Sequence, residues 1–153
     1  MKLNNMSFVM MVVFIFIMMG ATLSVFPNNV FGENLIEYSR TKDGTVYYYD
    51  LHSVKKSSGK VQVWVTVKYG EDDRTRIKII TILKENKQCN ECEKMSFSMS
   101  LIEIYCREDL FNFITSIDYN KDGNVIWTDK TSPENKHIIP GSRIEGLKDI
   151  ICN

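Results

Sequence analysis

The alternation of apolar and polar residues is most regular between positions 61 and 69. The four valines of this stretch point to one side of an extended chain, and the residues between them point to the other. This period of two predicts a strand with one covered, apolar face. Residues of the β-branched and aromatic kinds predict further strands at 34–40, 45–50, 97–108, 110–119 and 125–128. Asp-Gly pairs before two of these strands favour hairpin turns, so we expect an antiparallel sheet.

The end of the chain has the pattern of a helix. Ser142 and Glu145 form the Ser-x-x-Glu capping box, in which each side chain can bind a free amide of the first turn. An apolar stripe at helical spacing follows, formed by Ile144, Leu147, Ile150 and Ile151. A short helix with one apolar stripe needs a sheet to cover that stripe. The predicted fold class is therefore α+β, with a C-terminal helix packed on one face of the sheet.

The stretch 71–86 carries two conflicting patterns. Acidic residues at its start and lysines at its end are typical of a helix. However, Thr75, Ile77, Ile79 and Thr81 are β-branched and alternate as they would in a strand. We expect a strand or an irregular ribbon here, with a helix as the alternative.

The N-terminal segment predicts export from the cytoplasm. Residues 7–26 are almost continuously apolar, and Lys2 is the single charge before Glu33. This arrangement indicates a secretory signal peptide over residues 1–32, which leaves one domain at 33–153. About 20 apolar residues can also span a bilayer, so an uncleaved anchor is the alternative. The protein would then contact a membrane only through this segment.

The charge and the polar residues of the remaining chain exclude several functions. Of 19 basic residues Lys2 is lost with the signal peptide, so 18 basic residues face 19 acidic ones and the net charge is −1. This balance argues against a nucleic-acid binder. His52 and His137 lie far apart in predicted loops, and no catalytic constellation or cofactor motif accompanies them. We expect no enzyme and no cofactor. The aromatic residues are expected to pack in the core or on the sheet, with a binding surface as the alternative: Tyr47, Tyr48, Tyr49, Trp64 and Trp127.

All four cysteines follow the predicted signal peptide, at positions 89, 92, 106 and 152. An even number of cysteines in an oxidising compartment favours two disulfides, for which three connectivities exist. Cys89 and Cys92 form a Cys-x-x-Cys motif in a polar loop. We expect a local disulfide there, with a reducible thiol pair or a metal contact as alternatives.

One loop resembles a calcium site. Asp118, Asn120, Asp122 and Gly123 match positions one, three, five and six of an EF-hand loop, and Asp129 stands at position twelve instead of a glutamate. The same residues also fit a strand, an Asp-Gly turn and a second strand. The hairpin is the expected structure, and a calcium site is the alternative.

Several segments together resemble the surface-adhesin protein E-like family of bacterial exported domains. They are, in order, DGTVYYYDLHSV, VQVWVTVKY, LIEIYC, DYNKDGNV and IIPGSRIEGLKDIIC. The resemblance extends from about Leu35 to Cys152. It implies an antiparallel sheet with the C-terminal helix packed on one face and joined to a strand by a disulfide. The matching cysteines are Cys106 and Cys152.

The resemblance also implies a function. The protein would be a non-catalytic binding or adhesion-type module in the bacterial periplasm, at the cell surface or secreted, and it would act by contact with another protein. Two alternatives remain. One is a periplasmic thiol–disulfide protein that uses Cys89 and Cys92, and the other is a calcium-dependent module that uses the loop 118–129.

Overall fold

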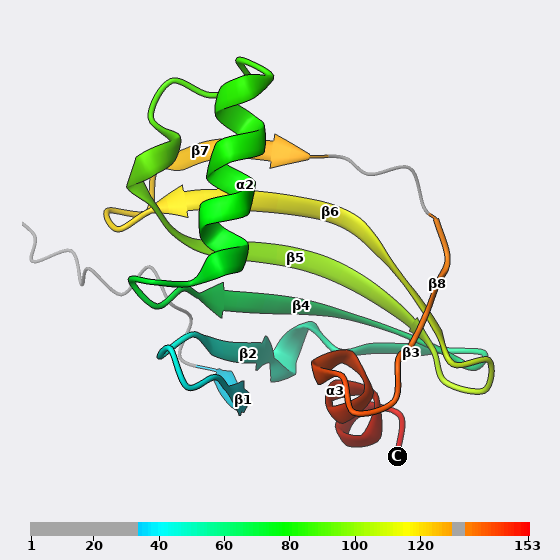
Figure 1. Cartoon of the computed structure of the whole chain (residues 1–153). Helices are drawn as coiled ribbons and strands as arrows, with labels where there is room; N and C mark the ends of the chain where they lie inside the picture. The colour runs from blue at the N-terminus through cyan, green and yellow to red at the C-terminus, as the bar shows by residue number, and fades with distance from the viewer. Residues whose placement is uncertain (1–33, 130–133) are drawn as a thin grey trace, which may run out of the picture.

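The computed structural model describes residues 34–129 and 134–153, which form one antiparallel sheet with two α-helices (Figure 1). The predicted signal peptide lies outside the described residues. The elements are β1 (Leu35–Arg40), β2 (Val46–Asp50), the 3₁₀ turn η1 (Leu51–Ser53), β3 (Lys55–Ser57), β4 (Lys60–Lys68), α2 (Arg74–Glu85), the 3₁₀ turn η2 (Cys92–Lys94), β5 (Met95–Tyr105), β6 (Leu110–Asn120), β7 (Val125–Asp129), β8 (Lys136–His137) and α3 (Arg143–Ile151).

The strand order is β1-β2-β4-β5-β6-β7, with β3 beside β4 and β8 beside β6. Every pairing between neighbouring strands is antiparallel. The fold class expected from the sequence is therefore confirmed. The same alternation in β4 that predicts a covered face places Val61, Val63 and Val65 in the core, where each is at most 3% exposed.

Helix α3 covers one end of this apolar face (Figure 1). Leu147 and Ile151 pack there with the valines of β4 and with Ile102 and Ile104 of β5. Ile150 belongs to the predicted stripe but is 47% exposed, because a nine-residue helix turns only part of its surface toward the sheet. The bond between Cys106 and Cys152 joins the end of α3 to the chain after β5, with 5.8 Å between the Cα atoms.

The predicted cap of α3 is present with one change. The Ser142 hydroxyl accepts a hydrogen bond from the Glu145 amide at 3.2 Å, as the capping box requires. The Glu145 carboxylate accepts from the Gly141 amide at 2.6 Å, one residue before the cap. Both side chains therefore bind free amides at the start of the helix.

The expectation of a strand or ribbon at 71–86 is wrong, because residues Arg74–Glu85 form helix α2. Asp73 caps its start by accepting from the Arg76 amide at 2.8 Å. Thr75, Ile79 and Ile82 have the spacing i, i+4 and i+7, which places them on one side of the helix. Capping and this helical stripe outweigh the β-branched alternation.

Candidate functional site

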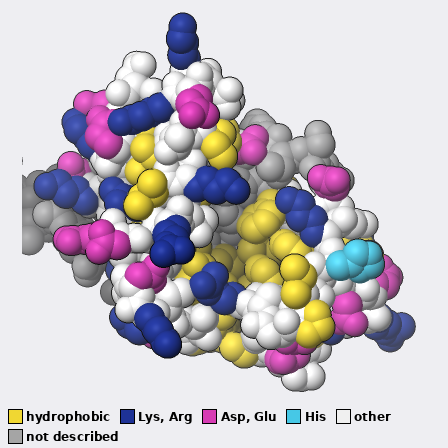
Figure 2. Space-filling model, in the orientation of Figure 1, with side chains coloured by type: hydrophobic (Ala, Val, Ile, Leu, Met, Phe, Trp, Pro, Cys, Tyr) yellow, Lys and Arg dark blue, Asp and Glu magenta, His cyan; other side chains and the backbone are white. Residues whose placement is uncertain are grey.

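A groove of about 420 Å³ lies between α2 and the sheet. Figure 2 shows hydrophobic side chains in a hollow beside this helix. Thr75, Ile79, Ile82 and Leu83 of α2 line one side. The other lining residues are Gln88 in the loop after α2, Tyr69 directly after β4, and the strand residues Val67, Ser98, Ser100, Phe113, Ser116, Asp118, Trp127 and Asp129. Its volume falls within the range of about 300–1,000 Å³ found for ligand sites in proteins.

The pairing of β5 with β6 explains why this part of the sheet is hollow. Ser98 of β5 lies opposite Asp118 of β6, and Ser100 lies opposite Ser116. Toward α3, the corresponding position of β5 holds Ile102, opposite Phe113. Serines therefore replace large apolar side chains between the regions that α3 and α2 cover. Small side chains leave open space there, and α2 forms one wall of it.

A chain of hydroxyl groups leads to a buried carboxylate on the floor of this groove. The hydroxyls of Tyr69 and Ser98 lie 2.9 Å apart, and Ser98 donates a hydrogen bond to Asp118. Asp118 is 4% exposed. Burial raises its pKa above the ordinary value, and the hydrogen bond from Ser98 opposes this rise. Burial likewise raises the pKa of Tyr69 to about 12, so this hydroxyl stays protonated at neutral pH.

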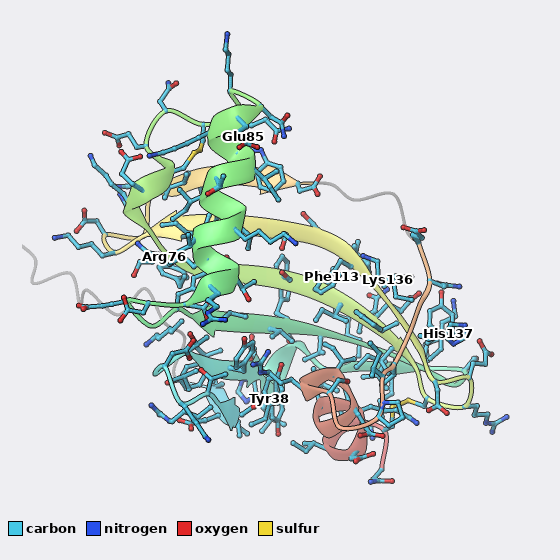
Figure 3. All side chains as sticks on the ribbon, viewed as in Figure 1. Tyr38, Arg76, Glu85, Phe113, Lys136 and His137 are labelled. Carbon is cyan, nitrogen blue, oxygen red and sulfur yellow. A yellow bond between two sulfur atoms is a disulfide. The ribbon has the colours of Figure 1, made fainter. Side chains whose placement is uncertain are left out.

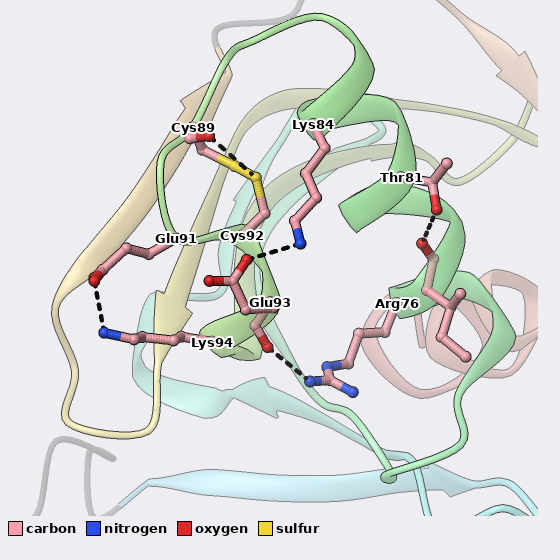
Figure 4. A network of polar contacts seen from close by, with 9 residues as sticks. Arg76, Thr81, Lys84, Cys89, Glu91, Cys92, Glu93 and Lys94 are labelled. Carbon is pink, nitrogen blue, oxygen red and sulfur yellow. Dashed lines mark hydrogen bonds and ion pairs between the residues drawn. A yellow bond between two sulfur atoms is a disulfide. The ribbon is translucent and has the colours of Figure 1, made fainter.

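Polar contacts fix α2 above the groove (Figure 4). The Arg76 guanidinium donates to the backbone oxygens of Met95 at 2.7 Å and of Glu93 at 3.2 Å. Near the other end of the helix, the Lys84 ammonium lies 2.9 Å from the Glu93 carboxylate. That second pair is exposed and contributes little on its own. The arginine therefore holds the wall of the groove against the strand that supplies its floor.

The Cys89–Cys92 pair closes the loop after α2, with 5.7 Å between the Cα atoms. This spacing is normal for a disulfide. Cys92 is fully buried and packs with Leu83 and Met95. The pair therefore joins the hydrophobic cluster under the end of α2, an environment typical of a structural cysteine and not of a reactive one.

The four calcium candidates lie on the β6–β7 hairpin and do not surround a common point. Asp118 pairs with Trp127 across the strands and forms part of the groove floor. The Asn120 side chain accepts from the backbone amides of Asp122 and Asn124, each at 2.9 Å, and so builds the turn. Asp129 lies at the other end of β7. In residues 34–129 and 134–153, no three His, Cys, Asp or Glu side chains are grouped as a metal site.

The two histidines also stay apart, with His52 in η1 and His137 in β8. Neither lines the groove. Within the described ranges, no helix has both the length and the apolar character needed to cross a bilayer.

The model of the family described as surface-adhesin protein E matches residues 35–153. The chain belongs to this family. It is therefore of the surface-adhesin type, and the family implies a location outside the cytoplasm. The resemblance seen in the sequence is confirmed over nearly the whole domain.

Solved structures with a similar fold come from Haemophilus influenzae. Crystal form II of protein E has a TM-score of 0.56 and 13% identity, and the match covers 80% of this chain and 89% of that one. A second structure of protein E has a TM-score of 0.56 and 12% identity, with 80% and 86% covered. Protein E from a non-typeable strain has a TM-score of 0.55 and 12% identity, with 80% and 77% covered. At this identity the likeness shows a shared fold. A search of curated proteins by sequence finds no match.

The sequence did not reveal the groove itself. Trp127 was expected in the core or on the sheet, and it packs against the cluster of Leu83, Cys92 and Met95 while it lines the groove. Asp118 was considered in the sequence as a residue of the expected hairpin and, alternatively, as a calcium candidate, but not as a groove residue. The signal that could have found the site is the change from isoleucine to serine along one face of β5, together with a helical assignment for α2.

Proposed function

We propose that this protein is an exported, non-catalytic adhesion-type module that binds another protein through the groove beside α2. The observation that carries the proposal is an open, mainly apolar groove on a scaffold whose family is adhesive. Ile82 on the wall of this groove is 44% exposed. When a partner covers such an apolar side chain, the burial of its surface stabilises the complex.

The surface outside the groove supports this choice of site. Ile77 lies on the same helix, is 52% exposed and does not line the groove. Single exposed apolar residues of this kind are ordinary on protein surfaces. What distinguishes Ile82 is that Ile79, Phe113 and Trp127 line the same hollow. Concave apolar sites with a few polar groups are the usual form of a binding site.

The test compares two isoleucines on one helix. The protein, produced from the whole sequence and purified after export, is immobilised and exposed to a panel of purified extracellular proteins. For a protein that binds, Ile82→Asn is expected to weaken binding roughly tenfold, since it removes about half of a buried isoleucine contact. Ile77→Asn is the matched control and is expected to leave binding unchanged. Binding of no panel protein, or an equal effect of both substitutions, would overturn the proposal.

A further inference from the structure

Among the described residues, no cationic side chain forms an ion pair with the carboxylate on the floor of the groove. Asp118 is almost fully buried, and in the described part of the chain its side chain has one hydrogen-bond partner, the Ser98 hydroxyl. Asp129 also lines the groove, and the described lining residues include no lysine, arginine or histidine. A carboxylate in such a place has lost most of its water, and a neutral hydroxyl replaces only part of the lost solvation.

The two ends of the groove differ in charge. Phe113 lines it at the side toward α3, and the Lys136 ammonium lies 5.8 Å from the centre of this ring (Figure 3). Asp118 lies on the same strand as Phe113, five residues further toward the β6–β7 turn. One end of the groove is therefore bordered by a cation, and the other end holds Asp118, while Asp129 lies between them, opposite Ser116. A ligand with one positive group would be oriented by this difference.

We propose that the groove takes a short partner segment in which a lysine or arginine stands between apolar residues, with the cationic group placed on Asp118. The inference rests on the proposed function, because it names the chemistry of the partner that would occupy the same groove. The apolar residues would contact Ile79 and Ile82 on the helix side and Trp127 on the sheet side. The aromatic face of Trp127 offers a second favourable contact for a cation.

Two properties of the site favour a basic occupant over a neutral one. A cation restores the interaction that Asp118 lost on burial, and hydrogen bonds between charged groups are stronger than neutral ones. The direction of the pKa shift of Asp118 agrees with this, because burial raises this pKa by disfavouring the charged form. An acidic side chain at this point would meet the Asp118 carboxylate and is disfavoured by repulsion.

The experiment uses a library of random peptides displayed on phage and selected on the immobilised, exported protein. The expected result is enrichment of sequences with one basic residue flanked by apolar ones, and loss of these sequences when Ile82→Asn replaces the original protein. Selection on the Asp118→Asn variant is expected to keep the apolar residues and to lose the preference for the basic one. Asparagine has the shape of aspartate and can still accept from Ser98, so the groove keeps its form.

A selected peptide is then titrated beside a copy in which glutamine replaces the basic residue. On the original protein the glutamine peptide is expected to bind about 10- to 100-fold more weakly, the range for loss of a charged hydrogen bond. This comparison does not depend on the folding of any variant. On Asp118→Asn the two peptides are expected to bind alike.

The outcomes separate the two proposals. Selected peptides that need Ile82 but show no basic residue, or equal affinity of both peptides for the original protein, would overturn the inference and leave the proposed function standing. Selected peptides that bind Ile82→Asn as well as the original protein would overturn both.

Discussion

Removal of the bond between Cys106 and Cys152 is expected to have the largest effect on stability of any change to the cysteines. The two residues are separated by 46 positions, so the bond closes a loop of 47 residues in the unfolded chain. The loop-entropy relation gives about 4 kcal/mol for a loop of this length. The whole unfolding free energy of a domain is typically about 5–15 kcal/mol, so the double substitution Cys106→Ala, Cys152→Ala removes a large share of it.

The Cys89–Cys92 bond provides the matched control. It closes only four residues, and the same relation gives about 2 kcal/mol. The assay is urea unfolding of both double-alanine variants without reductant, followed by tryptophan fluorescence and extrapolated to water. A loss below about 1 kcal/mol for the Cys106 and Cys152 variant would refute the argument from loop closure.

Hydrogen exchange tests the same change at the level of single elements. Without the bond, α3 is held on the sheet by its packing, mainly through Leu147 and Ile151. The amides of α3 are then expected to exchange faster through local opening. The amides of α2 are expected to lose only the protection that corresponds to the lower unfolding free energy of the whole domain. Equal loss of protection in both helices would show that the bond stabilises the protein only as a whole and does not hold α3 in particular.

Three further predictions concern single residues. Because burial raises the pKa of Asp118, the folded protein holds this proton more tightly than the unfolded chain, and stability falls as the pH rises from about 3.9 through the raised value. Asp118→Asn should therefore raise the Tm at pH 7 and lose this advantage below about pH 3.9; an unchanged difference in acid would contradict this account. Ser142→Ala removes the cap of α3 and should cost about 1 kcal/mol in urea unfolding, whereas Ser142→Gly should cost only a few tenths. Because Asn120 is engaged in its turn, calcium should leave the Tm unchanged, and a calcium-dependent rise would restore the metal site as a function.

The sequence predicts the sheet better than it predicts the groove, and the reason lies in the range of the interactions. The alternation of Val61 to Val67 and the cap at Ser142 are local patterns, and each is present in the structure. Helix α2 was missed because its β-branched residues satisfy a local strand pattern as well. The contacts that hold it, such as Arg76 to the Met95 oxygen, join residues 19 positions apart. No local pattern reports such a contact.

The groove depends on two long-range features at once, the packing of α2 and the packing of α3 on one face of the sheet. In the sequence, the serines at positions 98 and 100 are two small polar residues in a strand, and by themselves they predict no binding site. They become the floor of a site only because α2 and α3 pack on the same face of the sheet and leave a gap between them. Each helix has a disulfide at or just beyond its end, and α2 is also held by Arg76. Because these contacts hold both helices on the sheet, we expect the groove to be preformed, so that a partner segment loses less free energy to ordering when it binds.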